Sequence, residues 1–452
     1  MSKFELSRRD FLKIAGMLPA LPYSALRQRA AAADPWDEAR TILGRIKEPS
    51  FPARDFDAKR YSSLNEAINA CSAAGGGRVV VPAGDFPTGA IRLKSKVNLH
   101  LSEGAVLKFS ADPKAYLPAV FTRWEGTELM SYSPLIYAFD QQDIAITGPG
   151  TLDGQADATH WWDWTRNQAA SRRRLVEFGA SGTPLAQRVF GEGSFLRPNF
   201  IQPYRCRNVY IEGVTIKNSP MWEIHPVLST NIIVRGVTIN SHGPNNDGCN
   251  PESCRDVLIE RCSFDTGDDC IAIKSGRNND GRRVAVPVEN VIVRDCTMKD
   301  GHGGVTIGSE ISGGARNIFA ERCKMDSPNL NIALRLKTNS VRGGIIEHVY
   351  MRDVTIGQVS QAVLGVDFLY EEGDAGQFPP VVRDIEVRNV TSQKSRNALS
   401  LRGYAHTPIT NVRLRDCKFE NVAQADVLEN VKDVVLTNVS VNGMVRNETI
   451  TK

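Results

Sequence analysis

The sequence lacks a surplus of charge once its first residues are set aside. The 452 residues carry a formal net charge of +4. Residues 1–33 account for all of it, with two acidic side chains (Glu5 and Asp10) and six basic ones, namely Lys3, Arg8, Arg9, Lys13, Arg27 and Arg29. A nucleic-acid-binding protein normally shows a basic balance and a basic stripe. The neutral remainder therefore argues against a nucleic acid as partner.

The sequence also lacks a metal-binding motif that can be recognised from spacing. It contains nine cysteines and seven histidines, but no set of them has the ligand spacing of a zinc site. We therefore expect neither a metal nor another cofactor.

Apolar runs long enough to cross a membrane are missing as well. The run at residues 14–26 is shorter than the roughly 20 residues that a spanning helix needs. A charged start precedes it and small residues follow, which is the pattern of a cleaved export signal. The segment "SRRDFLK" is similar to a twin-arginine signal, with Arg8 and Arg9 as the pair. We predict a signal peptide over residues 1–33, export to the periplasm or medium, and no membrane association after cleavage.

What the sequence has is a repeat. Nine copies of a phrase such as "RNVYIEGVTI" follow one another from residue 207. Apolar residues dominate one, three, six and eight positions after a polar anchor, the alternation of two short strands that meet at a corner. Such units bury a core only by stacking, so we predict an all-β fold: one right-handed parallel β-helix over residues 34–452. The anchors are Asn208, Asn231, Asp256, Asn290, Asn317, His348, Asp384, Asn411 and Asp433.

Cysteine belongs to one column of this repeat. The sixth position after the anchor is Val in five copies and Cys in four, at residues 262, 296, 323 and 417. We interpret these four as small buried apolar residues. Cys249 and Cys254 are close enough in sequence to form a disulfide, a question that the sequence leaves open.

Two segments stand apart from the regular copies. Ser63 and Glu66 form the signature of a capping box, which predicts a short helix over the open N-terminal end of the solenoid. The interval from Asp143 to Asn208 is 65 residues, far longer than one coil, and it contains "HWWDWTRNQAASRRR". We expect this insertion to form a wall at one end of a binding cleft. We expect a monomer.

Two adjacent acids interrupt the apolar pattern in "RCSFDTGDDCIAIKSG". Asp268 lies twelve positions after its anchor, and His302 lies twelve positions after the next anchor, so the two should stack on neighbouring coils. Adjacent residues of a regular strand point to opposite faces. Asp268 and Asp269 can therefore share a site only if the chain bends there, and Gly267 would permit the bend.

Further charged residues fall on the neighbouring coils. Asp247 lies one coil earlier, and Arg335 and Lys337 lie one coil later, on one face of a strand. Clustered acids cannot all ionise cheaply, so the group supplies both a proton donor and a base, as glycoside hydrolysis requires. Arg335 offers a planar fork and Lys337 a compact charge, which together predict a subsite for a sugar carboxylate.

These residues resemble the motifs of the polygalacturonase family, glycoside hydrolase family 28, in its bacterial exported members. The family's four short motifs appear in order over nearly the whole mature chain: Asn245–Asp247 (Asn-x-Asp), Asp268–Asp269, Gly301–Gly303 (Gly-His-Gly) and Arg335–Lys337 (Arg-x-Lys). The resemblance implies hydrolysis of α-linked galacturonic acid bonds in pectic polysaccharide. Asn246 and Gly267 differ from the commonest family forms, which leaves the fine specificity open.

The resemblance also implies roles. Asp268 would be the general acid, while Asp247 and Asp269 would hold and deprotonate the attacking water, with inversion at the anomeric carbon. His302 would hydrogen-bond within the acid cluster. The implied substrate-binding residues are Asn245, Arg335, Lys337 and Tyr370.

Two other classes of protein remain open from the sequence. A pectate lyase is also a β-helix and would use these acids as Ca²⁺ ligands. A non-catalytic β-helix could bind polysaccharide along its concave face. Within the hydrolase reading, the long insertion predicts exo-acting cleavage from a chain end, whereas the exact pectic linkage cannot be deduced.

Overall fold

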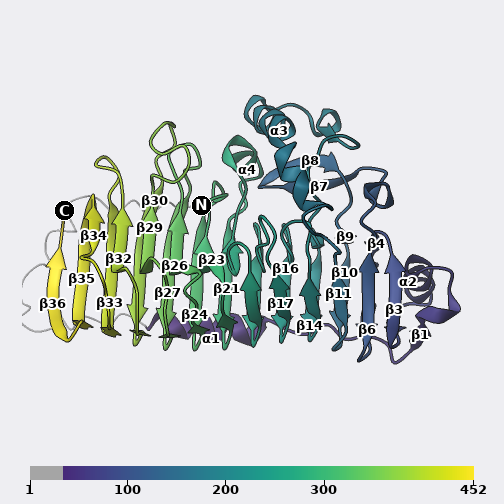
Figure 1. Ribbon diagram of the computed structural model, residues 1–452, viewed down its shortest axis with the longest axis horizontal. Coiled ribbons are helices and arrows are strands. Elements are labelled where there is room, and N and C mark those ends of the chain that lie inside the picture. The colour runs from purple at the N-terminus through teal and green to yellow at the C-terminus, as the bar shows by residue number, and fades with distance from the viewer. Residues whose placement is uncertain (1–33) are drawn as a thin grey trace, which may run out of the picture.

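The computed structural model of the protein describes residues 34–452 (Figure 1). The predicted signal peptide lies outside these residues. The described chain forms a right-handed parallel β-helix, whose coils stack along the long axis of the molecule. The predicted solenoid is therefore confirmed.

A regular coil contributes one strand to each of three faces, and the first two faces belong to one bent sheet of 24 strands. The first face contains β2 (Gly77–Val81), β5 (Val97–Leu101), β10 (Gln142–Thr147), β14 (Arg207–Glu212), β16 (Thr230–Arg235), β18 (Arg255–Glu260), β21 (Val288–Arg294), β24 (Ala315–Glu321), β27 (Ile345–Arg352) and β30 (Val381–Arg388). The second contains β3 (Gly84–Thr88), β6 (Ala105–Phe109), β11 (Thr151–Asp153), β15 (Thr215–Lys217), β17 (Thr238–Ser241), β19 (Ser263–Thr266), β22 (Thr297–Met298), β25 (Lys324–Met325), β28 (Thr355–Ile356) and β31 (Thr391–Ser392). Near the C-terminus, β33 (Ile409–Phe419) and β35 (Val431–Val441) span both faces, and β36 (Met444–Ile450) pairs antiparallel with β35.

The third face carries the site described below. Its strands are β4 (Ile91–Arg92), β9 (Ile136–Phe139), β13 (Ile201–Tyr204), β20 (Ile271–Ile273), β23 (Gly301–Ile307), β26 (Leu330–Lys337), β29 (Ala362–Asp367), β32 (Asn397–Arg402) and β34 (Val427–Glu429). Between β13 and β20 the face continues through isolated parallel bridges that join Ile201, Ile224, Cys249 and Ile271 in order. The face is therefore one ladder of rungs in register.

The polar anchors of the repeat make the bends between faces. All nine have φ between 55° and 59°, a left-handed conformation that Asn and Asp tolerate better than most residues. Anchors also bond to one another across coils: Asn231 Nδ2 donates to Asn208 Oδ1 at 2.8 Å, and Asn317 Nδ2 donates to Asn290 Oδ1 at 3.0 Å. The anchors thus fix both the bend and the register of successive coils.

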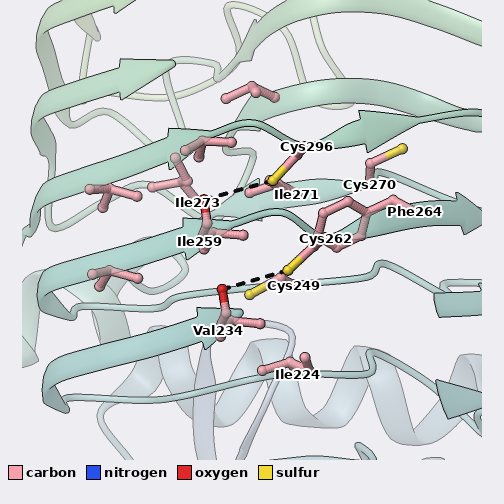
Figure 2. Packing of buried hydrophobic residues seen from close by; sticks show 14 of the residues in the cluster. Ile224, Val234, Cys249, Ile259, Cys262, Phe264, Cys270, Ile271, Ile273 and Cys296 are labelled. Atoms are coloured by element: carbon pink, nitrogen blue, oxygen red, sulfur yellow. Dashed lines mark hydrogen bonds between the residues drawn. The ribbon is translucent and has the colours of Figure 1, made fainter. Parts of the chain in front are cut away.

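The interior is apolar, and the cysteine column points into it (Figure 2). All nine cysteines are buried and free, so Cys249 and Cys254 are not joined by a disulfide. Cys262 Sγ donates to Val234 O at 3.5 Å, a weak bond that suits a small residue packed among Ile and Val side chains. The four column cysteines are buried as predicted.

Two helices cover the solenoid in different ways. At its N-terminal end α2 (Leu64–Ala73) confirms the predicted cap, and Ser63 Oγ accepts from Glu66 N at 3.2 Å. Helix α1 (Pro35–Arg45) lies along the outside of several coils (Figure 1). Its Trp36 packs edge-on against Phe319, with ring centroids 5.4 Å apart. The repeat pattern gives no sign of α1, because its partners lie on outward-facing positions.

The remaining elements gather above the third face. They include the antiparallel pair β7 (Val120–Trp124) and β8 (Thr127–Ser131), helix α3 (Ala169–Ser181) from the long insertion, and helix α4 (Asn278–Val284). Short pieces complete the chain: β1 (Asp55–Asp57), β12 (Val189–Phe190) and the 3₁₀ helices at Ala58–Arg60, Pro113–Tyr116, Trp162–Arg166 and Leu185–Gln187. Within residues 34–452 none of the helices combines the length and the apolar character needed to cross a membrane.

Candidate active site

A polar cleft opens on the third face, where β20, β23 and β26 lie side by side. Seven of the eight residues proposed from the sequence line it, and the eighth, Asp269, lies completely buried beneath. The lining residues are Glu125, Arg172, Trp222, Asn245, Asp247, Asp268, Lys274, His302, Ser309, Glu310, Arg335, Lys337, Tyr370 and Glu371. The structure thus brings together residues that span more than 200 positions of the sequence.

Asp268 and His302 stack on neighbouring coils as the repeat register predicts. His302 Nδ1 lies 2.9 Å from Asp268 Oδ1, and His302 N donates to Asp268 O at 3.1 Å. The hydrogen bond to Asp268 is the main cause that raises the pKa of His302 above its usual value. The Asp268 side chain is 18% exposed and the His302 side chain 51%, so this pair faces the open cleft.

The bend between Asp268 and Asp269 has a different cause from the one proposed. The strand β19 ends at Thr266, so the two acids lie outside regular strand geometry. Gly267 does not have a positive φ; instead, a Cβ there would lie 2.4 Å from Gly243 O. Glycine is required because two backbones approach closely at this point. Asp269 is fully buried at this point, whereas the Asp268 side chain is exposed to the cleft.

The two other acids of the cluster differ in charge environment. Burial and the nearby Asp268 charge raise the pKa of Asp247 well above its usual value, against the opposing effect of Lys274. Burial also raises the pKa of Asp269, but the cations Lys337, Arg335 and Lys274 outweigh it and hold the net value below the usual range. Asp269 is therefore the firmly ionised member of the cluster.

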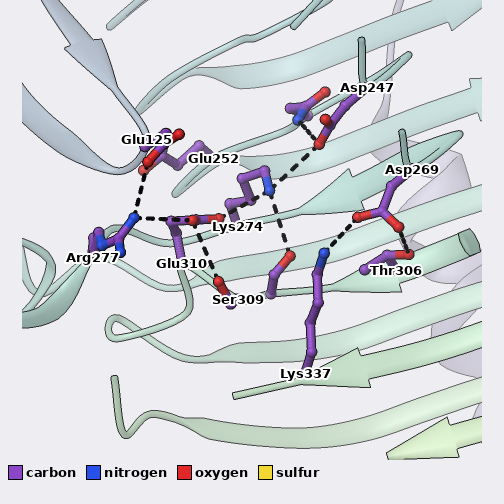
Figure 3. A network of polar contacts seen from close by, with 12 residues as sticks. Glu125, Asp247, Glu252, Asp269, Lys274, Arg277, Thr306, Ser309, Glu310 and Lys337 are labelled. Carbon is purple, nitrogen blue, oxygen red and sulfur yellow. Dashed lines mark hydrogen bonds and ion pairs between the residues drawn. The ribbon is translucent and has the colours of Figure 1, made fainter. Parts of the chain in front are cut away.

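The two cations on β26 are largely engaged with Asp269, and Figure 3 shows the contact that Lys337 makes. Lys337 Nζ donates to Asp269 Oδ2 at 2.8 Å, and Arg335 Nη1 donates to Asp269 Oδ1 at 3.3 Å. Lys337 is buried, whereas the Arg335 side chain is 19% exposed. The Tyr370 ring lies over both, with its centroid 5.8 Å from the Arg335 guanidinium and 5.2 Å from Lys337 Nζ. Arg335 thus offers the more accessible cation to a ligand.

The Asn-x-Asp segment combines a lining residue with a structural one. Asn245 lines the cleft, and its Oδ1 accepts from Arg197 Nη2 at 2.7 Å. Asn246 is fully buried, and its side-chain amide bonds to the backbone of Ser219, Met221 and Gly243. The difference from the commonest family form at Asn246 therefore affects the packing of this turn and not contact with a ligand.

Sequence reasoning missed much of the charge around the acids. Lys274 is buried, with Nζ 3.0 Å from Glu310 Oε2 and 3.6 Å from Asp247 Oδ2 (Figure 3). Trp222 lies beneath it, its ring centroid 4.4 Å from the Lys274 Nζ. Lys274 belongs to the same segment as Asp268, but a lone lysine near a strand end usually indicates a solvated position.

One side of the cleft is closed by ion pairs between separate elements. Arg172 on α3 contacts Glu125, at the β7–β8 turn, at 2.8 Å, and lies 3.7 Å from Glu371. Arg277 joins the same group, 3.0 Å from Glu125 and 3.6 Å from Glu371. Arg342 pairs with Glu371 at 2.5 Å. The long insertion therefore forms part of a wall, as expected, together with the β7–β8 turn, Arg277 and the segment after Tyr370.

The three acids lie close enough together to resemble a metal site. Asp247, Asp268 and Asp269 each offer a carboxylate oxygen, and these atoms lie within 4.8 Å of one another. Ca²⁺ takes roughly six to eight oxygen ligands, and here the ammonium groups of Lys337 and Lys274 already contact two of the carboxylates. This environment fits acid–base chemistry better than a calcium-dependent lyase.

Comparison with known sequences identifies the group of proteins that share this arrangement. The profile of the family described as "Glycosyl hydrolases family 28" matches residues 191–441, more than half of the chain. A probable polygalacturonase from Vitis vinifera is 29% identical over 422 residues, which cover 90% of this chain and 78% of that protein. An exo-poly-alpha-D-galacturonosidase from Dickeya chrysanthemi is 26% identical over 363 residues, covering 74% of this chain and 59% of that protein.

Solved structures of polygalacturonases are also similar to this chain. A hyperthermoactive exopolygalacturonase from Thermotoga maritima matches with a TM-score of 0.89 and 42% identity, covering 92% of this chain and 98% of that one. A family 28 exopolygalacturonase from Yersinia enterocolitica matches with a TM-score of 0.73 at 21% identity, which supports the fold alone. The chain belongs to glycosyl hydrolases family 28.

Proposed function

We propose that the protein is an exo-acting polygalacturonase, which hydrolyses α-linked galacturonic acid bonds at a chain end of pectic polysaccharide. The observation that carries this function is a cluster of three acids in a cleft closed on one side by ion pairs. The Thermotoga maritima relative, an exopolygalacturonase, supports the same activity. A sugar chain that meets the wall can only present its end to the acids.

We propose that Asp268 is the general acid. It is the most exposed of the three acids, and His302 holds its carboxyl by the 2.9 Å contact. Its proton would pass to the glycosidic oxygen as the bond to the sugar breaks. Asp247 and Asp269, both buried below, would hold the attacking water, and one of them would accept its proton.

The cations Arg335 and Lys337 have different roles toward the carboxylate of the substrate. Lys337 serves mainly to keep Asp269 ionised, because its ammonium group is buried against that carboxylate. Arg335 donates through Nη1 to Asp269 and to His302 O, and among the described residues its Nη2 makes no hydrogen bond. We propose that Nη2 binds a galacturonate carboxylate, with Tyr370 and Asn245 contacting the sugar.

Inversion at the anomeric carbon is part of the proposal, although the acids are unusually close for it. Inverting glycosidases commonly separate their carboxyl groups by about 6.5–9.5 Å, which leaves room for water between them. Here three carboxylate oxygens lie within 4.8 Å of one another. The water would therefore lie beside Asp247 and Asp269, on the side away from Asp268.

Both the exo mode and the inversion predict the first product of digestion. We expect free galacturonic acid as the main early product from polygalacturonate, released in the β-anomeric form, while the viscosity of the polymer falls slowly. Proton NMR during the first minutes and chromatography of the oligosaccharides measure these together. An early ladder of intermediate oligosaccharides would contradict the exo mode, and an initial α-anomer would contradict inversion.

We also propose that the chain is exported by the twin-arginine route, on the sequence pattern at Arg8 and Arg9 alone. Replacing both residues with Lys should leave the protein in the cytoplasmic fraction, because the receptor recognises the arginine pair. Cell fractionation of the parent and the variant measures the effect. Unchanged export of the variant would rule out this route.

A further inference from the structure

Lys274 is an ammonium group inside the protein rather than on its surface. It follows β20, is 2% exposed, and lies over Trp222 with 4.4 Å between Nζ and the ring centroid. Burying a charge is costly unless it is paired. Its partners are Glu310, at 3.0 Å, and Asp247, at 3.6 Å. Lys274 thus connects a cluster acid to a carboxylate of the wall.

The contacts of Asp247 are unevenly divided between its two oxygens. Oδ2 accepts from Asn250 Nδ2 at 2.8 Å and is also the oxygen nearest to Lys274. Among the described residues Oδ1 has no hydrogen-bond partner, and Asp247 lines the cleft. Asn250 and Lys274 therefore hold one oxygen in place and leave the other directed to where a water can bind.

We propose that Lys274 is a positioning residue of the hydrolysis: it orients Asp247 and supplies a buried positive charge that favours the ionised form of this carboxyl. The inference rests on the proposed function, in which Asp247 takes part in activating the water. In the reaction, the water gives a proton to Asp247 Oδ1 as its oxygen bonds to the anomeric carbon. Asp268 gives its proton to the leaving oxygen, and Lys274 keeps its three protons throughout.

The electrostatic balance around Asp247 supports a need for this charge. Burial and the Asp268 carboxylate both disfavour ionised Asp247, and Lys274 is the largest opposing influence. Glu310 competes for the same ammonium group, since it lies closer to it than Asp247 does. The other charged or titratable groups that face this pair are Asp268 and Asp269 before β20, His302 on β23, Arg335 and Lys337 on β26, Arg277 at the start of α4, and Glu223 on the preceding coil.

A plot of kcat against pH should fall on its acidic side as Asp247 becomes protonated. Two substitutions should shift this acidic limb in opposite directions. Lys274→Met keeps the length of the side chain and removes the charge, so the limb should move to higher pH by about one unit or more. At a pH below the acidic limb, each pH unit of this shift lowers kcat about tenfold. Glu310→Gln removes the competing carboxylate, so the limb should move to lower pH. Lys394 is exposed and provides the control: Lys394→Met should leave the acidic limb at the pH of the parent.

The measurement is kcat and KM for galacturonate release from polygalacturonate between pH 3 and 8, with thermal unfolding of each variant as a check of folding. If the parent releases no galacturonate, the proposed function fails. If the parent is active but the limb of a folded Lys274→Met variant stays in place, the role of Lys274 is wrong. If that variant does not fold, Glu310→Gln decides alone: an unchanged limb, or one moved to higher pH, overturns the proposal.

Discussion

Asp268→Asn should lower kcat on polygalacturonate by about 10²-fold or more, because general acid catalysis commonly contributes 10²–10⁴-fold. The substitution keeps the size of the side chain and removes the proton that the leaving oxygen needs. Asp268 faces the cleft and contacts His302 at its surface, so the fold and substrate binding should both survive. Steady-state kinetics on polygalacturonate, together with binding of an oligogalacturonide to the variant, measure the two effects separately.

A leaving group that needs no proton provides the sharpest control. On a nitrophenyl galacturonide the loss caused by Asp268→Asn should shrink greatly, because nitrophenolate departs unaided. Asp265→Asn is the matched variant: Asp265 belongs to the same coil but lies outside the cleft, 2.9 Å from His242. It should retain the activity of the parent. Near-normal turnover of a folded Asp268→Asn variant on the polymer would move the acid role to another residue.

The fold could be predicted because the repeat shows which positions of successive coils are equivalent. Each anchor marks a left-handed bend, and the apolar positions after it mark the interior, so residues at equal offsets lie above one another. This register alone placed His302 next to Asp268, and the structure shows the two in contact. The same counting identified the cysteine column, because every member occupies one inward position of its coil.

The surroundings of the acids could not be predicted in this way. Arg335 and Lys337 share one face of a strand, as their spacing requires, but spacing does not show that Asp269 turns inward to meet them. The two cations are therefore not both free for a sugar carboxylate, since Lys337 is a buried partner of Asp269. Arg172 and Glu371 come from segments outside the repeat, so nothing in the sequence relates their positions to the acids.

Lys337→Met should be the most disruptive single substitution in the cleft. It leaves the Asp269 carboxylate buried with Arg335 as a more distant partner, at 3.3 Å. Removing one member of a buried ion pair typically costs about 3–5 kcal/mol of unfolding free energy. Since Lys337 is a main cause of the low pKa of Asp269, the stability that depends on this charge is present above about pH 4, the unfolded value, and is lost as pH falls. The deficit of the variant should therefore be largest near neutral pH and smaller in acid.

A double substitution separates the structural role of this pair from its role in the reaction. Lys337→Met combined with Asp269→Asn removes both charges, and replacing a whole buried pair by neutral groups is often close to neutral for stability. The double variant should recover most of the lost unfolding free energy, measured by urea denaturation at pH 7. Its kcat should remain about 10²-fold or more below the parent, because the ionised Asp269 that helps to activate the water is gone. If activity returned together with stability, Asp269 would be a structural partner of Lys337 only, and the water would have to be activated by Asp247 alone.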